Sequence, residues 1–179
     1  LVKALVVERV ESATKKNLRS DVQLAAARAL RHVGPEHADR IMAALERHIL
    51  KDRVTVERRF GALPPVECIR SQMDQVFLNL LANSGQAITG PGRITITTTV
   101  EGGHAVVAIA DSGPGIPAAI LGQIFDPFFT TKPVGEGTGL GLSISYEIVK
   151  KHGGELRAES PAADGAEFTL RIPIERRVA

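Results

Sequence analysis

The stretch FDPFFTTKPVGEGTGLGLS, Phe125 to Ser143, decides how this chain folds, together with a second glycine-rich loop just before it, DSGPGIP, Asp111 to Pro117. Glycine loses more backbone entropy on folding than other residues, so loops this rich in glycine meet a need that only glycine fulfils. The usual candidate is close approach to a phosphate group. Neither loop contains G-x-x-x-x-G-K-[ST] or G-x-G-x-x-G, which excludes a P-loop, the dinucleotide fingerprint and the glycine loop of protein kinases.

Composition places the chain among water-soluble globular proteins. Its 179 residues suit one domain with an appendage. The sequence contains no run of about 18 apolar residues, the length needed to span a membrane. Charges of both signs are interspersed along the chain and the net charge is +2, so the sequence shows no basic cluster of the kind that binds nucleic acid. The single Cys68 and the absence of a signal peptide predict a reducing, cytoplasmic location, and we expect Cys68 to be a buried apolar residue rather than a nucleophile. Because the chain begins at Leu1, we expect it to be a piece of a longer protein.

Hydrophobic periodicity predicts a mixture of helices and strands. The expected helices span residues 17–33, 37–50, 71–90, 117–124 and 138–152. The expected strands span residues 52–57, 93–100, 105–111, 155–160 and 166–174, with Gly102 and Gly103 in the turn of the first hairpin. This order favours an α+β fold, in which helices cover one face of a mixed, mostly antiparallel sheet.

The helix expected to begin near Ser71 and to end before Gly90 has the clearest signature. Ser71 and Asp74 have the spacing of a capping box. Its apolar residues form a wide stripe that should face the core: Met73, Val76, Phe77, Leu80, Leu81, Ala87 and Ile88. Asn79 and Asn83 are one turn apart, so the sequence predicts two amide side chains on one face, beside the edge of this stripe.

Four motifs follow one another along the chain: NLLAN (Asn79–Asn83), DSGPG (Asp111–Gly115), FDPFF (Phe125–Phe129) and GTGLG (Gly137–Gly141). In this order they resemble the N, G1, F and G2 boxes of the catalytic ATP-binding domain of sensor histidine kinases, and the run from Pro127 to Ser143 resembles the nitrogen-regulation-type subgroup. The resemblance implies a Bergerat-type two-layer sandwich for residues 35–179. Residues 1–34 would then be a helical arm, a possible remnant of the dimerisation and histidine-phosphotransfer hairpin.

The resemblance also implies the nucleotide contacts. Asp111 would accept a hydrogen bond from the amino group of adenine, which would favour ATP over GTP. Asn83 would contact Mg²⁺ with Asn79 in support, because neutral oxygens suit that ion. Lys132 would reach the terminal phosphate as a point charge. The remaining expected nucleotide contacts lie in the glycine-rich loops and in the last strand: Gly113, Gly115, Ile116, Phe128, Gly137, Thr138, Gly139, Leu140, Gly141 and Thr169.

Each of these assignments has a structural alternative. DSG is good turn chemistry, so Asp111 could simply cap a turn, and an isolated pair such as Asn79 and Asn83 could be solvated helix residues. The glycines from Gly135 to Gly141 are expected to form a lid that ends at a helix N-terminus, where free N–H groups favour phosphate. Phe125, Phe128 and Phe129 are expected to anchor that lid. At Gln86 the sequence departs from the family, and we assign that side chain no phosphate contact.

In the superfamily that the sequence resembles, the residue at the position of Asn79 distinguishes enzymes that hydrolyse ATP from histidine kinases. ATPase branches of the superfamily carry a glutamate there to activate water, and asparagine cannot act as a general base. We therefore expect slow hydrolysis and an ATP-dependent histidine kinase whose acceptor histidine lies upstream of Leu1, since no histidine here has the acceptor motif. The implied partners are that dimerisation domain, a response regulator receiver domain and a second copy of the kinase. The alternatives are a nucleotide-regulated interaction module and a serine kinase of the anti-sigma type.

Overall fold

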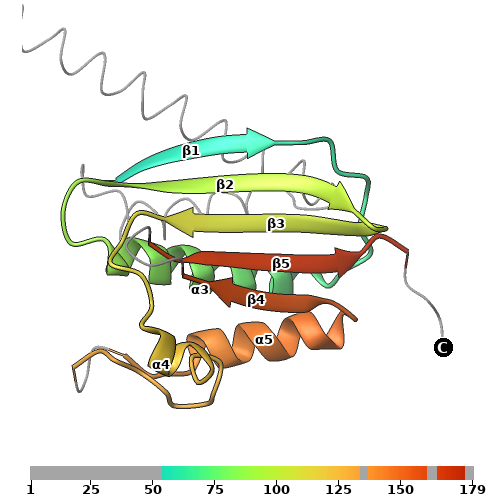
Figure 1. Cartoon of the computed structure of the whole chain (residues 1–179). Coiled ribbons are helices and arrows are strands. Elements are labelled where there is room, and N and C mark those ends of the chain that lie inside the picture. Colours follow the sequence, from blue (N-terminus) through green and yellow to red (C-terminus); the bar gives the residue numbers. More distant parts are fainter. Residues whose placement is uncertain (1–53, 134–136, 161–164, 176–179) are drawn as a thin grey trace, which may run out of the picture.

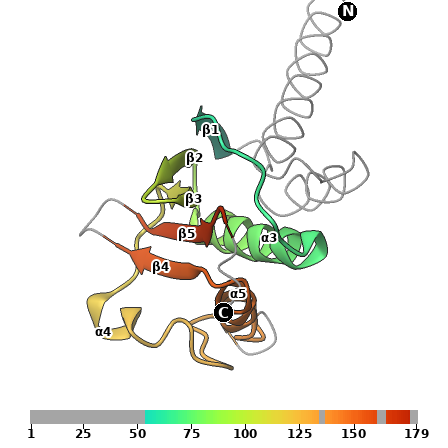
Figure 2. The same cartoon turned by 90° about the vertical axis from the view of Figure 1, so that its right-hand side faces the viewer.

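The computed structural model describes residues 54–133, 137–160 and 165–175. These residues form a five-stranded sheet with two helices, α3 (Arg70–Ala87) and α5 (Gly141–Lys151), on one face (Figures 1 and 2). The helices expected at 17–33 and 37–50, the arm 1–34 and Gly135 lie outside the described residues. Among those described, no helix is long and apolar enough to cross a membrane.

The sheet has the order β1-β2-β3-β5-β4. Its strands are β1 (Val54–Phe60), β2 (Gly92–Glu101), β3 (His104–Asp111), β4 (Glu155–Glu159) and β5 (Glu167–Pro173). The β1 strand runs parallel to β2, and the other neighbours are antiparallel. This arrangement confirms the mixed, mostly antiparallel sheet and both predicted hairpins, with Gly102 and Gly103 in left-handed conformations at the first turn.

The core lies between the sheet and the two helices. Alternate residues of β5 are buried, namely Phe168, Leu170 and Ile172, as period-two patterning requires. From helix α3 (Arg70–Ala87), Met73, Val76 and Leu80 are almost completely buried against them. The predicted apolar stripe is therefore the face that α3 packs on the sheet.

The predicted capping box is wrong. Helix α3 begins at Arg70, its N-cap is Ile69, and no side chain caps it. Ser71 is therefore the second residue of the helix rather than its N-cap, and it is exposed, whereas Asp74 is buried. The Ile69 N–H donates instead to His152 Nε2 at 3.0 Å, which fastens the start of α3 to the end of α5.

Two other helices are shorter than predicted. Helix α4 (Ala118–Leu121) ends before Gly122 rather than at Ile124. Helix α5 (Gly141–Lys151) begins three residues later than Thr138. Gly139 has a φ of +65°, outside the helical region, so the helix can begin only after it.

Candidate nucleotide-binding site

Three elements that carry the predicted site residues end or begin at the same edge of the domain. In Figure 1, β3 points toward the end of the sheet at which α3 finishes and α5 starts. Asp111 is the last residue of β3, Asn79 and Asn83 lie in the C-terminal half of α3, and Gly141 opens α5. The fold therefore gathers the N, G1 and G2 motifs at one place.

Asp111 is held in a fixed orientation. It is 5% exposed, and its Oδ1 accepts hydrogen bonds from the backbone N–H groups of Gly113, at 2.9 Å, and Ala166, at 3.4 Å. Its own N–H donates to the carbonyl of Ala166 at 2.8 Å. Within the described chain these bonds engage Oδ1, which leaves Oδ2 as an oriented acceptor for a ligand.

The backbone around Asp111 requires glycine at position 165. Gly165 has a φ of +80°, and a Cβ there would lie 1.7 Å from the carbonyl oxygen of Asp111. The Gly165 carbonyl accepts a hydrogen bond from Ser160 Oγ at 2.8 Å, and that hydroxyl accepts one from the Ile116 N–H at 2.7 Å. Ser160 and Ala166 therefore support the DSGPG loop, and sequence reasoning missed both because nothing local to them marks a contact with a distant strand.

Asn79 ties α3 to α5. Its Nδ2 donates to the carbonyl of Gly141 at 3.0 Å and to Ser145 Oγ at 3.1 Å. Ser145 is fully buried and donates to the same Gly141 carbonyl at 2.8 Å. The amide hydrogens of Asn79 thus position the first turn of α5, and its carbonyl oxygen remains the atom able to face a cation.

We expect Ser145→Ala to lower the free energy of unfolding by about 1–3 kcal/mol, because it removes a buried donor and acceptor at once. Urea denaturation followed by circular dichroism would measure this. Ser71→Ala is the matched control: with no side-chain cap on α3, the change should stay within about 0.5 kcal/mol, whereas a real N-cap would cost about 1 kcal/mol. A loss at Ser71 that matched the loss at Ser145 would contradict this assignment.

Lys132 lies beside the end of α3. Its Nζ is 3.5 Å from Asn83 Oδ1 and also donates to Gln86 Oε1. Partial burial lowers the pKa of the Lys132 ammonium below its usual value. Both partners are neutral amides, so their dipoles hold the ammonium without cancelling its charge.

The segment that connects α4 to α5, residues 122–140, includes most of the glycines predicted to form the lid, and it is called the lid loop from here on. Phe128 and Gly139 approach each other closely: the Phe128 N–H donates to the Gly139 carbonyl at 3.0 Å, and a Cβ on Gly139 would lie 2.4 Å from the Phe128 backbone. Gly137 packs against the Lys132 side chain, and the Leu140 N–H lies 3.4 Å from Thr138 Oγ1. The loop thus ends at the first turn of α5, whose free N–H groups can receive an anion.

Residues 68–176 match the family model described as "Histidine kinase-, DNA gyrase B-, and HSP90-like ATPase". The chain belongs to this family. It is 42% identical over 122 residues to sensor histidine kinase ZraS of Escherichia coli O157:H7 and 34% identical over 139 residues to sporulation kinase C of Bacillus subtilis. These matches cover 66% and 75% of this chain but only 26% and 32% of those kinases.

Solved structures of histidine kinases agree with this placement. The catalytic domain of histidine kinase ThkA is 35% identical, with a TM-score of 0.66, over 78% of this chain and 91% of that one. A mycobacterial sensor histidine kinase, MprB, is 31% identical with the same TM-score over 77% of this chain and 92% of that one. The described residues therefore form an ATP-binding catalytic domain of the sensor histidine kinase type. The nitrogen-regulation subgroup stays a prediction.

Two predicted contacts of the histidine kinase domain do not agree with the structure. Thr169 lies on the face of β5 opposite to Phe168, and so opposite to the layer that Asp111 faces; its hydroxyl donates to Glu167 at 3.3 Å. Strand alternation therefore directs Thr169 away from the layer that Asp111 faces, where the adenine contact was predicted. Phe128 is 74% exposed, so its predicted role as an anchor of the lid is wrong, whereas Phe125 and Phe129 pack against the core. The predicted contact of Phe128 with the nucleotide stays a prediction.

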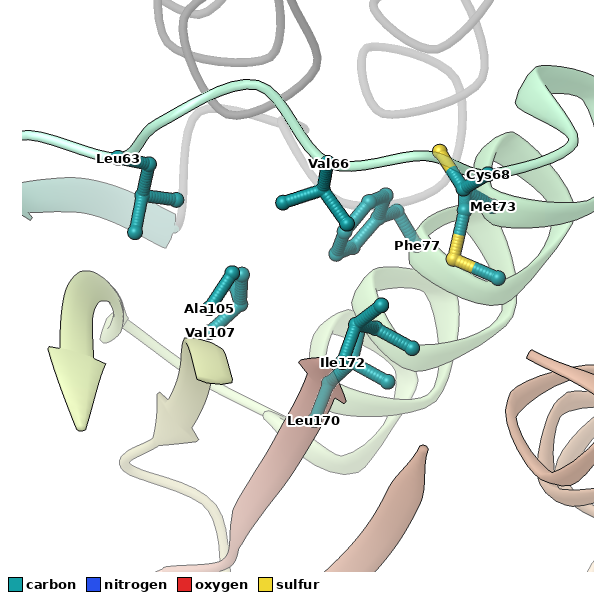
Figure 3. Close-up of a pocket in the computed structure, with 9 residues that line it drawn as sticks. All are labelled: Leu63, Val66, Cys68, Met73, Phe77, Ala105, Val107, Leu170 and Ile172. Carbon is teal, nitrogen blue, oxygen red and sulfur yellow. The ribbon is translucent and has the colours of Figure 1, made fainter. Parts of the chain in front are cut away.

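An apolar cavity of the histidine kinase domain lies elsewhere (Figure 3). Its lining comes from the connection between β1 and α3, from α3 itself and from strands β3 and β5: Leu63, Val66, Cys68, Met73, Phe77, Ala105, Val107, Leu170 and Ile172. Burial, reinforced by the nearby Asp74, raises the pKa of the Cys68 thiol. The lining is apolar and the raised pKa disfavours the thiolate, which agrees with the prediction that Cys68 is not a nucleophile, but Cys68 is half-buried rather than buried as predicted.

Proposed function

We propose that this domain binds Mg·ATP and transfers the γ-phosphoryl group to a histidine of a separate dimerisation domain, which passes it to a response regulator. The observation that carries the proposal is the side chain of Asn79. At the position where an ATPase of this superfamily needs a general base, Asn79 donates hydrogen bonds to Gly141 and Ser145. An amide engaged in this way cannot take a proton from water.

The donor set around Asn83 fits a magnesium ion carried by the nucleotide. Among the described residues, no group of three or more histidine, cysteine, aspartate or glutamate side chains could hold a metal. Asn83 Oδ1, with the Asn79 carbonyl oxygen in support, offers the hard neutral oxygens that Mg²⁺ accepts beside waters and phosphates. When bound, the ion would neutralise charge on the transferred phosphoryl group.

The protein groups of the site would bind and orient the nucleotide. Asp111 would receive the adenine amino group on Oδ2, with Gly113, Gly115 and Ile116 lining the base. Lys132 would meet the terminal phosphate, and Thr138 to Gly141 would present N–H groups to the phosphate chain. A neutral histidine is already a good nucleophile, so alignment and charge neutralisation are the main requirements for transfer.

The acceptor histidine would come from outside the described residues. His152 accepts the Ile69 N–H on Nε2 at 3.0 Å, and its Nδ1 lies 2.7 Å from the Ile148 carbonyl. His104 Nδ1 lies 2.9 Å from the Gly102 carbonyl at the hairpin turn. Both rings have structural hydrogen bonds, which favours an acceptor on a separate dimerisation domain. The full kinase that we propose is a homodimer in the cytoplasm. We propose that residues 1–34 belong to that dimerisation region.

The test is calorimetric titration with Mg·ATP, followed by a phosphate-release assay on the same sample. We expect micromolar to millimolar binding and phosphate release close to the protein-free rate, because no base activates water. Added dimerisation domain should then become phosphorylated in an acid-labile, base-stable form, as phosphohistidine is. Rapid phosphate release without an acceptor would favour an ATPase, and an acid-stable product would favour a serine kinase.

A further inference from the structure

Lys132 and the end of α3 make a contact that the family motifs do not include. Lys132 lies on the lid loop, and its Nζ reaches both Asn83 Oδ1 and Gln86 Oε1. The two amides are three positions apart on α3, so they face the same side. The lysine is thereby held between them, 49 positions along the chain from Asn83.

The chemistry of this contact differs from the other cation contacts of the domain. Arginine side chains pair with glutamates on the exposed face of the sheet, as in Arg157–Glu155 at 2.7 Å and Arg171–Glu101 at 3.3 Å. In the described part of the chain, the contacts of Lys132 Nζ are amide oxygens instead. An ammonium has three donors. When Asn83 Oδ1 binds Mg²⁺, as proposed above, the bond to Gln86 is the one that keeps the lysine in place, and the remaining donors and the full positive charge are left for an anion.

We propose that Gln86 is a positioning residue: it holds Lys132 beside Asn83, where the ammonium can meet the terminal phosphate of ATP. This inference rests on the proposed function and deepens it. A lysine side chain has many rotamers, and fixing one of them before binding removes part of the entropic cost of binding. Gln86 itself is exposed and touches the phosphate only through Lys132.

Neutrality is the reason a glutamine suits this role. A glutamate at position 86 would form an ion pair with Lys132 and cancel the charge that the phosphate needs, and it would repel the phosphate as well. A leucine would keep the approximate size of the side chain but offer no acceptor. The pair Gln86→Leu and Lys132→Met therefore separates the positioning role from direct contact with the nucleotide.

The experiment is a double-mutant cycle on the whole chain. Calorimetry would give the Kd of Mg·ATP and of Mg·ADP for wild type, Gln86→Leu, Lys132→Met and the double variant. We expect Gln86→Leu to weaken Mg·ATP binding about three- to tenfold, the range that one hydrogen bond corresponds to, and to leave Mg·ADP unchanged. In the Lys132→Met background, Gln86→Leu should have no further effect.

Gln75→Leu is the matched control, because Gln75 is an exposed glutamine of the same helix, and it should leave both affinities unchanged. Equal weakening of ATP and ADP, persistence of the effect in the Lys132→Met background, or no effect at all would overturn the positioning role. Those results would leave the proposed function standing as long as wild type binds Mg·ATP. Absence of binding by wild type would overturn both.

Discussion

Replacing Asp111 with asparagine is expected to weaken Mg·ATP binding by more than about tenfold while the domain stays folded. Oδ1 of Asp111 accepts the N–H groups of Gly113 and Ala166. An asparagine must keep its carbonyl oxygen toward these donors. Its NH₂ group would then face the amino group of adenine, so two donors would meet where a donor and an acceptor met before.

Calorimetry with ATP and ITP would measure this effect, since the two nucleotides differ at the base atom that Asp111 would contact. Asp111→Asn should weaken ATP more than ITP, because ITP offers an oxygen to the new NH₂ group. Asp126→Asn, an exposed aspartate of the lid loop, is the control and should change neither affinity. Unchanged ATP affinity in Asp111→Asn would refute the adenine assignment.

Replacing Gly165 with alanine is expected to lower the free energy of unfolding by about 3 kcal/mol or more. The new Cβ would lie 1.7 Å from the Asp111 carbonyl oxygen at a φ of +80°, so the backbone must move. That movement would displace Ala166, which exchanges hydrogen bonds with Asp111. ATP affinity should therefore fall even at temperatures where the variant is still folded.

Urea denaturation of Gly165→Ala would measure the loss of stability, and calorimetry on the same variant would measure the loss of ATP affinity. Gly122→Ala is the control, because Gly122 has a φ of −72° and nothing lies within 4 Å of the place that a Cβ would occupy there. That change should be neutral or slightly stabilising, since alanine restricts the unfolded chain. Equal stability of Gly165→Ala and wild type would mean that the loop has an alternative conformation without the close approach.

The hydrophobic periodicity of the sequence predicted the layers of this domain well, because an element that buries one face needs apolar residues at its own helical or strand spacing. The α3 stripe and the alternation of β5 both follow from one face packing on the core. The ends of the helices were predicted less well, since they depend on competition between local backbone and side-chain interactions. The predicted capping box is wrong because the helix begins one residue before Ser71, and α5 starts late because Gly139 has a positive φ and lies against the Phe128 backbone.

The ordered motifs located the site, but they did not reveal which residues hold its parts together. The bonds of Asn79 to Gly141 and Ser145, and of Lys132 to Gln86, join positions more than 40 residues apart. Thr169 was misplaced for a related reason: a motif position does not state which face of a strand a side chain occupies. The pairings of Asn79 and Lys132 become visible only when the packing of α3 against α5 and the lid loop is known, and the face of Thr169 only when the burial pattern of β5 is known.

The sheet order has a consequence for how freely the lid loop can vary in length. The chain leaves the sheet after β3 and returns at β4, which lies on the far side of β5, so α4, the lid loop and α5 form one excursion. The entropy of closing such a loop grows only with the logarithm of its length, so lengthening it by half would cost about 0.4 kcal/mol. Insertions in the lid loop are therefore expected to cost little folding free energy, so its length can vary without loss of the fold.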